Sequence, residues 1–175
     1  MKKILSMILA LTMVLSLAAC GSKNDAPATE AVDLTAFYTE LAGKYGWIDE
    51  QTPVEEIGES SIMMMDLTQD KEFLDSYFPG LSEIATKQLI AMTSSISAVV
   101  SEFVFAECES EEDAAKVAES LNARVTMQAD GGAWYPESVE AWGNAQVVSN
   151  GNFVAMIAYA DNQAEIVDAF NALFA

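Results

Sequence analysis

The sequence contains no histidine. Histidine is the commonest general base in enzymes, and its ring nitrogens are frequent metal ligands. Its absence excludes a Ser-His-Asp triad and every histidine-based metal site. No phosphate-binding loop is present either, because the one glycine pair, Gly131-Gly132, stands alone. We therefore expect no catalytic residues, no metal site and no cofactor.

Basic residues are also few. Eight Lys and Arg stand against 27 Asp and Glu, which gives a net charge of −19. A surface of this charge repels the phosphates of nucleic acids and the headgroups of anionic lipids. Nucleic-acid binding is therefore excluded, and no basic patch assists attachment to a membrane.

One of the two cysteines, Cys20, lies where a long apolar run ends. Two lysines precede that run, which covers 4–17 and is shorter than the roughly 20 residues of a membrane-spanning helix. This is the plan of a secretory signal peptide. The motif Leu17-Ala18-Ala19-Cys20 resembles the lipobox of bacterial lipoproteins. The resemblance implies cleavage between Ala19 and Cys20 and a diacylglycerol on the Cys20 thiol. The alternative is an ordinary signal peptide that happens to contain a cysteine.

Loss of residues 1–19 would leave six basic residues against 27 acidic ones, a net charge of −21. Residues 20–32 are small and polar, as expected of a flexible tether. Residues 33–175 are enough for a single globular domain. Two acyl chains, such as palmitate, would hold this domain at the extracytoplasmic face of the cell membrane. Cys108 then has no disulfide partner and is predicted to be a buried apolar side chain.

Apolar residues recur at helical spacing in four segments, which are 34–45, 70–78, 114–125 and 166–174. Asp33 is a candidate N-cap for the first helix. Ser110 and Asp113 approximate a capping box before the third.

Strand-like patterns lie between these helices. Residues 61–67 form a short apolar run, and 89–92 and 96–108 are rich in Val, Ile, Phe, Thr and Ser. Within 96–108, the stretch SEFVFAEC alternates with both faces partly buried. Asn150-Gly151 between two apolar runs predicts a hairpin with a type I′ turn. We predict an α+β fold: an antiparallel sheet with helices on one face, built of two β-β-α units and preceded by an N-terminal helical segment. Segments 103–123 and 153–172 look alike, although any two strand-turn-helix units share this pattern.

Several motifs together are similar to a known family. They are the lipobox, the Trp134-Tyr135-Pro136 segment, and the closing pattern AQVVSNGNFV at 145–154 that leads to AFNALF at 169–174. The chain resembles Gram-positive, Clostridia-type lipoproteins with a single domain of unknown function. The resemblance covers nearly the whole mature chain and implies a location and a fold without a known activity. The segment at 123–133, interrupted by Gly131-Gly132, departs from the family pattern.

Three aromatic residues, Trp134, Tyr135 and Trp142, are the candidate partner-binding residues. They lie in a predicted long loop, where aromatic rings can stack on a sugar or a partner protein. The alternative is that they cover the open end of the core. If they form a binding face, Trp134 or Trp142 should be exposed.

Two other clusters suggest ligands only weakly. The methionines at 63–65 fit a core strand better than a soft-metal site, because consecutive strand residues face opposite sides. The acidic run at 107–113 lacks the spaced ligands and central glycine of a calcium-binding loop, and fits a solvated helix start.

The sequence thus favours a lipid-anchored, non-enzymatic protein that binds an envelope protein or glycan. One alternative is a solute- or ion-binding lipoprotein, although a two-lobed receptor needs about twice this length. The other is a glycan-active enzyme that relies on carboxylates alone.

Overall fold

The computed structural model describes residues 31–96 and 98–175. The predicted signal peptide at 1–19, its cleavage site at Ala19 and Cys20, and the predicted tether up to residue 30 lie outside the described residues. Within them, Val32–Ala175 forms one contiguous unit.

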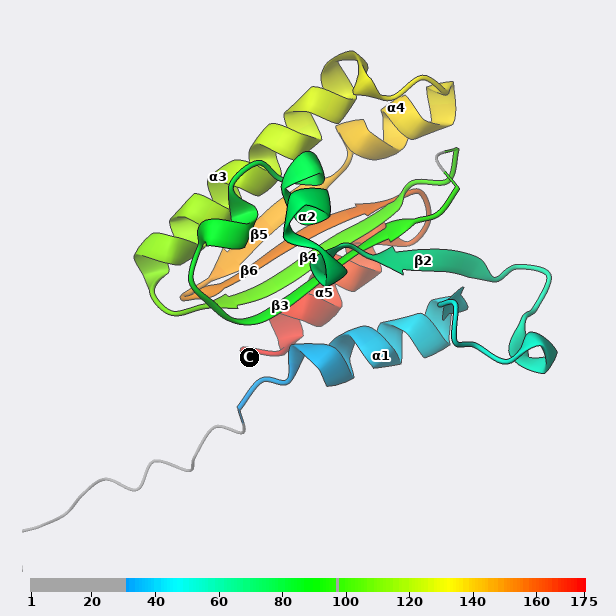
Figure 1. Cartoon of the computed structure of the whole chain (residues 1–175), viewed down its shortest axis with the longest axis horizontal. Helices are drawn as coiled ribbons and strands as arrows, with labels where there is room; N and C mark the ends of the chain where they lie inside the picture. The colour runs from blue at the N-terminus through cyan, green and yellow to red at the C-terminus, as the bar shows by residue number, and fades with distance from the viewer. Residues whose placement is uncertain (1–30, 97) are drawn as a thin grey trace, which may run out of the picture. The chain divides into compact units, whose positions relative to one another are not determined.

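A six-stranded sheet occupies the centre of this unit, in the spatial order β1-β2-β3-β4-β6-β5 (Figure 1). Neighbouring strands from β2 to β5 are antiparallel, and the short β1 joins β2 in parallel. The strands are β1 (Trp47–Ile48), β2 (Ile62–Asp66), β3 (Thr86–Ser94), β4 (Ser101–Cys108), β5 (Gln146–Asn150) and β6 (Phe153–Tyr159).

Five α-helices cover the sheet. They are α1 (Leu34–Tyr45), α2 (Lys71–Tyr77), α3 (Glu111–Met127), α4 (Pro136–Gly143) and α5 (Gln163–Ala172). Short helical turns lie at η1 (Val54–Glu56), η2 (Leu67–Gln69), η3 (Leu81–Glu83) and η4 (Gln128–Gly132), the last of them a π-helical turn. The predicted α+β class, the antiparallel β-β-α units and the N-terminal helical segment are confirmed.

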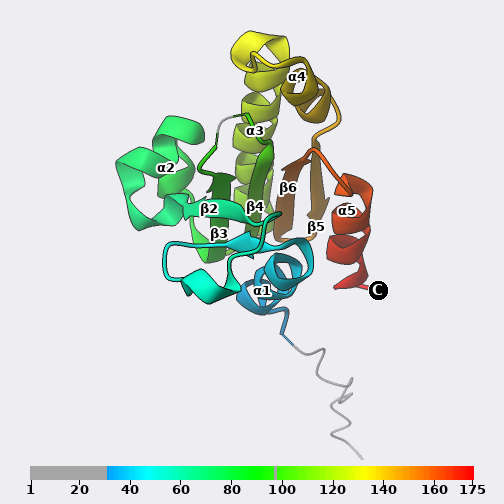
Figure 2. The ribbon, with the colours of Figure 1, turned by 90° about the vertical axis from the view of Figure 1, so that its right-hand side faces the viewer.

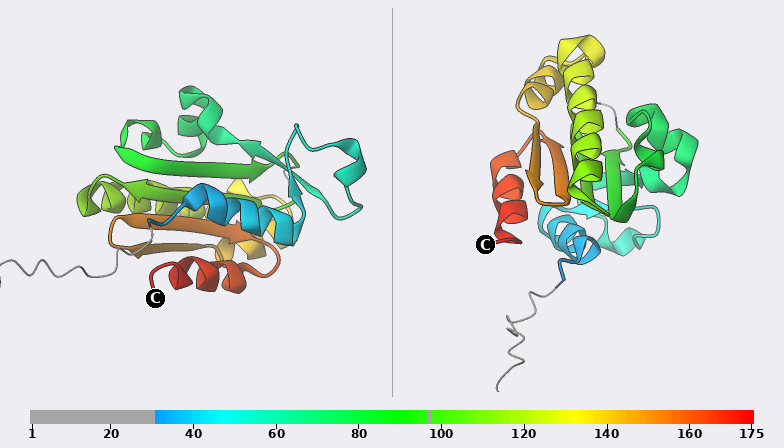
Figure 3. Two further views of the ribbon diagram at one scale, coloured as in Figure 1. Left: turned by 90° about the horizontal axis from the view of Figure 1, so that it is seen from below. Right: turned by 90° about the vertical axis from the view of Figure 1, so that its left-hand side faces the viewer.

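The helices lie on both faces of the sheet, so the prediction of helices on one face is wrong. Residues of α2, α3 and α4 pack on one face, and residues of α1 and α5 pack on the other. Figure 2 shows α3 and α1 on opposite sides of the strands, and the left view in Figure 3 looks onto α1 and α5.

The reason is the two-residue period of a strand. From the shared Phe-Val pair onward, β6 (153–159) is one residue longer than the matching part of β4 (103–108). Strand β4 therefore ends on Cys108, which packs on the α3 face, whereas β6 ends on Tyr159, which packs on the α5 face. The two similar units thus send their helices to opposite sides.

The two cores differ in composition. The α1/α5 face is rich in aromatic rings, with Phe105 against Phe37 at 5.2 Å and Trp47 against Phe103 at 4.3 Å between ring centroids. The α2/α3/α4 face is mostly aliphatic, with Val104, Ala106 and the buried Cys108 along β4.

Local signals set the helix starts as expected. The side chain of Asp33 accepts a hydrogen bond from the Ala36 amide, and the Ser110 hydroxyl accepts one from the Asp113 amide. The Asp113 carboxylate also accepts a hydrogen bond from the Ser110 hydroxyl at 2.7 Å. These contacts satisfy amides that have no partner inside the helix.

The hairpin between β5 and β6 is present, but its turn differs from the predicted type I′. Asn150 pairs with Phe153, so Gly151 and Asn152 are the two central residues. A type I′ turn requires positive φ at both, and here φ is positive at Gly151 alone (57°). Glycine at the first central position is the pattern of a type II′ turn.

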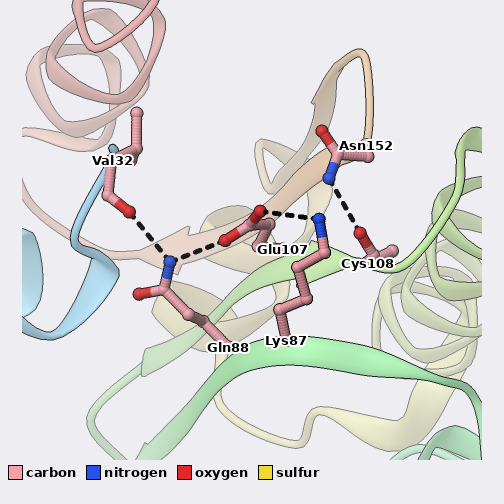
Figure 4. Close-up of polar contacts among 6 residues, drawn as sticks. All are labelled: Val32, Lys87, Gln88, Glu107, Cys108 and Asn152. Atoms are coloured by element: carbon pink, nitrogen blue, oxygen red, sulfur yellow. Dashed lines mark hydrogen bonds and ion pairs between the residues drawn. The ribbon is translucent and has the colours of Figure 1, made fainter. Parts of the chain in front are cut away.

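The chain enters the domain through a polar clamp at one end of the sheet (Figure 4). The Gln88 side-chain amide donates to the Val32 carbonyl and to Glu107, both at 2.8 Å, and its oxygen accepts from the Leu34 amide at 2.9 Å. A register shift between Thr86 and Gln88 marks a bulge in β3. Lys87 at this bulge also reaches Glu107, at 3.3 Å. The start of α1 is thereby fixed to the sheet.

Candidate functional site

A cavity of about 700 Å³ lies at the opposite end of β3 and β4, on the face covered by α2, α3 and α4. Thr93, Glu102 and Arg124 contribute to its lining, together with hydroxyl-bearing residues of the β3–β4 connection and of α4. The volume is within the range of small-molecule binding sites.

A buried ion pair forms part of this lining. Arg124 on α3 donates from Nε to Glu102 Oε1 at 2.8 Å and from Nη2 to Oε2 at 2.9 Å. The side chain of Glu102 is 4% exposed and that of Arg124 is 10% exposed. The Thr93 hydroxyl donates a third hydrogen bond to Glu102 Oε2 at 3.2 Å. Because the contact is bidentate and nearly dry, it fixes both side chains in direction.

Aromatic rings hold the guanidinium of Arg124 in place. Its Cζ atom lies 4.8 Å from the ring centroid of Tyr77 on α2 and 5.4 Å from that of Trp142 on α4. Both distances are within the range of cation–π contacts. Arg124 therefore joins α2, α3 and α4 to strand β4 at a single point.

The rim of the cavity is built by the connection from α3 to α4. Helix α3 continues into the turn η4, which is kinked because Asp130 and Gly131 leave the helical conformation, with φ of 125° at Gly131. A Cβ atom on Gly132 would approach the Met127 carbonyl to 2.9 Å, so no larger residue fits there without movement. Pro136 then starts α4 at a position that needs no amide hydrogen. This turn brings Trp134 and Tyr135 to the cavity.

All three aromatic residues predicted from the sequence line this cavity. Trp134 is 90% exposed and Tyr135 is half-exposed, whereas Trp142 is 5% exposed. The prediction of a long loop here is wrong, because α4 occupies part of it and carries Trp142 into the core. Trp142 thus covers the end of the core and Trp134 stands at the rim.

Comparison with known proteins places the chain in a family. A family model described as a domain of unknown function, DUF4358, matches residues 58–159. The chain belongs to this family. No curated protein and no solved structure matches it. The resemblance to a family with a single domain of unknown function is confirmed to this extent, and the lipoprotein character remains a prediction.

The matched DUF4358 region contains every residue that lines the cavity, from Met65 to Trp142. Helices α1 and α5 lie outside the match, on the other face of the sheet. The cavity is therefore a feature of the DUF4358 domain itself.

Glu102 and Arg124 in the DUF4358 domain were not found from the sequence, although two signals mark them. Arg124 is the only arginine in the chain. Glu102 shares its strand face with Val104 and Ala106, at a position where the alternation calls for an apolar residue. A charged residue on a buried strand face needs a partner of opposite charge.

The chemistry of the DUF4358 cavity is polar and nearly balanced in charge. Among its lining residues Glu102 is the one acidic and Arg124 the one basic side chain. The residues that line this cavity therefore do not include the pair of facing carboxylates that glycosidases use. Within 31–96 and 98–175, no group of three His, Cys, Asp or Glu side chains is placed to hold a metal ion.

The remaining cysteine of the DUF4358 domain lies away from this chemistry. Cys108 is fully buried. Burial raises the pKa of its thiol, and the nearby Asp113 and Glu107 raise it further. A thiol held in its protonated form is a poor nucleophile, as its acidic flanks suggested.

Among the described residues, no helix combines the length and apolar character needed to cross a membrane.

Proposed function

We propose that this protein is a lipid-anchored binding protein of the extracytoplasmic membrane face, and that its cavity holds part of an envelope partner. The observation that carries the proposal is the buried Glu102–Arg124 pair in the lining of a cavity whose rim presents an exposed tryptophan. Rigid polar groups inside a concave site, with a free aromatic ring at its mouth, are the usual elements of a binding site.

The cavity lies far from the point where the chain enters the domain. The chain enters the domain at Val32, beside Gln88 and Glu107, and the cavity lies at the other end of β3 and β4. At about 3.3 Å per residue, the length of β4 separates the two ends by about 23 Å. The entry point of the chain at Val32 and the cavity are therefore at opposite ends of these two strands.

A solute-binding role is the second candidate, and the size of the cavity favours it. About 700 Å³ is enough for a free small molecule as well as for one unit of a larger partner. The two candidates use the same residues and differ in whether the ligand is attached to the envelope.

Site-specific photo-crosslinking in intact cells tests the proposal. A photoreactive residue at Tyr135, on the rim, should give an adduct with a large envelope component. The same residue at Val54, which is exposed and lies outside the cavity, should not. Equal adducts from both positions, or none from Tyr135, would contradict a binding partner at this site.

The anchor is tested separately. Replacement of Cys20 by Ala should abolish incorporation of a fatty-acid analogue and release the protein from the membrane fraction. Undiminished labelling of the variant would show that Cys20 does not carry the lipid.

A further inference from the structure

We infer that the ligand unit held in the cavity is an uncharged sugar of a glycan. The inference rests on the proposed function and adds the chemical class of the ligand. Three features of the cavity carry it: the hydrogen-bonding groups left available in its lining, the charge around it, and the exposed ring at its rim.

The ion pair leaves more donors than acceptors for a ligand. A guanidinium has five N–H groups, and the contacts within 31–96 and 98–175 use one on Nε and one on Nη2. A carboxylate has about four acceptor positions, and Glu102 uses three of them. Tyr77 and Trp142 contact the guanidinium through their rings, and no hydrogen bond among the described residues takes up its other three N–H groups. A ligand with several acceptor oxygens and a hydroxyl donor matches this set.

Charge disfavours both an acidic and a cationic ligand. An acidic ligand would add a second negative charge beside Glu102, in a chain of net charge −19. A cationic ligand would meet the unused N–H donors of Arg124, which already carries the positive charge of the cavity. An uncharged, hydroxyl-rich molecule avoids both penalties. Ser94, Ser95 and Ser138 add further hydroxyl-bearing residues to the lining.

The rim supplies the apolar contact that a sugar needs. A pyranose ring has polar edges and a face of C–H groups, and that face stacks on aromatic rings. Trp134 lines the cavity, and its ring has little protein against it. Protein partners instead bind over wide surfaces of about 800 Å² on each side. A cavity with one free indole and a polar interior therefore fits a sugar better than a protein surface.

Titration of the full chain, kept in a detergent without a sugar headgroup, tests the inference. The probes are uncharged tetrasaccharides of glucose, galactose, mannose or N-acetylglucosamine. Two charged probes are compared with them. One is the cationic tetrasaccharide made by removing the acetyl groups from the N-acetylglucosamine probe, and the other is an acidic tetragalacturonate. At least one uncharged probe should bind and shift the emission of the exposed Trp134. Both charged probes should bind at least tenfold more weakly, a difference of about 1.4 kcal/mol.

Trp134→Ala should weaken binding of the uncharged probe at least tenfold while leaving the melting temperature unchanged. Val54→Ala, at another exposed apolar residue, should change neither quantity. Binding that survives Trp134→Ala, tighter binding of either charged probe, or no binding of any uncharged probe would overturn the inference. An adduct at position 135 without binding of any sugar probe would leave the proposed function standing and overturn the sugar inference alone. Absence of both would remove both proposals.

Discussion

Two glutamates on β4 show how differently one strand can use the same side chain. Glu102 lies at the cavity end, on the α3 face, and is bound by Arg124 in a nearly dry pair. Glu107 lies at the other end, on the face of α1, and binds Lys87 and Gln88 with 18% of its side chain exposed. They are five residues apart, an odd spacing, so the strand turns them to opposite faces. The first is costly to unpair, whereas water can replace partners of the second.

Breaking the cavity pair should have the largest effect. Glu102→Gln keeps the shape of the side chain but leaves the buried Arg124 without a counter-charge. We expect a loss of about 3–5 kcal/mol in the free energy of unfolding, measured by urea denaturation. Glu109→Gln, at an exposed carboxylate just beyond the same strand, should stay within about 0.5 kcal/mol.

A double variant separates the charge from the packing. Replacing Glu102 by Met together with Arg124 by Leu removes both charges, and should recover much of the loss seen for Glu102→Gln. If the double variant were as unstable as the single one, the burial of an unpaired charge would not be the cause.

The next effect concerns the aromatic residues of the cavity. Trp142→Ala removes a buried ring that packs against Arg124, and should cost about 3 kcal/mol, the lower part of the range for core tryptophans. Trp134→Ala removes an exposed ring and should cost less than about 0.5 kcal/mol. Thermal melts of both variants check this contrast. Equal losses would mean that Trp134 supports the fold and does not stand free at the rim.

At the Glu107 end, the hairpin turn is the sensitive point. Gly151→Val places a β-branched residue at φ of 57°, and should cost more than about 1 kcal/mol. No atom lies within 4 Å of the new Cβ, so backbone strain alone causes the loss. Gly143→Val is the control, because its Cβ also meets open space and its φ is not positive. A similar loss at both positions would point to the side chain and not to the turn.

This turn also shows what the sequence could and could not predict. The local dipeptide located the hairpin, but the type of turn depends on which residues pair across the strands, and here Asn150 pairs with Phe153. Most of the strands, the caps and the aromatic residues of the cavity were predictable because each depends on neighbours in sequence. The two-residue strand β1 was missed. The side of the sheet that α5 covers depends on one added residue in β6. An alignment of the two similar segments passes over this residue as a one-residue offset, so it does not predict the side.

The Glu102–Arg124 ion pair could not be predicted from such local patterns. Glu102 and Arg124 are 22 positions apart and meet only after α3 folds back on the sheet. The sequence shows that a lone arginine and a charged residue on a buried strand face each need a partner. It does not show that the two side chains meet, because that depends on how the chain folds. The same holds for Gln88, which contacts Val32 across 56 positions.

The smallest effect expected from loss of a polar contact is at Glu107, and it depends on pH. A hydrogen bond from Gln88, and then the contact with Lys87, lower the pKa of Glu107 below its ordinary value. A lowered pKa in the folded state adds stability above the unfolded pKa of about 4.3, and this stability is lost as the pH falls through the folded pKa. Because Lys87 is partly exposed, the contribution at pH 7 should be about 0.5–1 kcal/mol. Melting temperatures of wild type and Glu107→Gln should therefore differ at pH 7 and converge as the pH falls well below 4. A difference in melting temperature that stays constant over this pH range would show that the charge of Glu107 contributes nothing to the clamp at Val32.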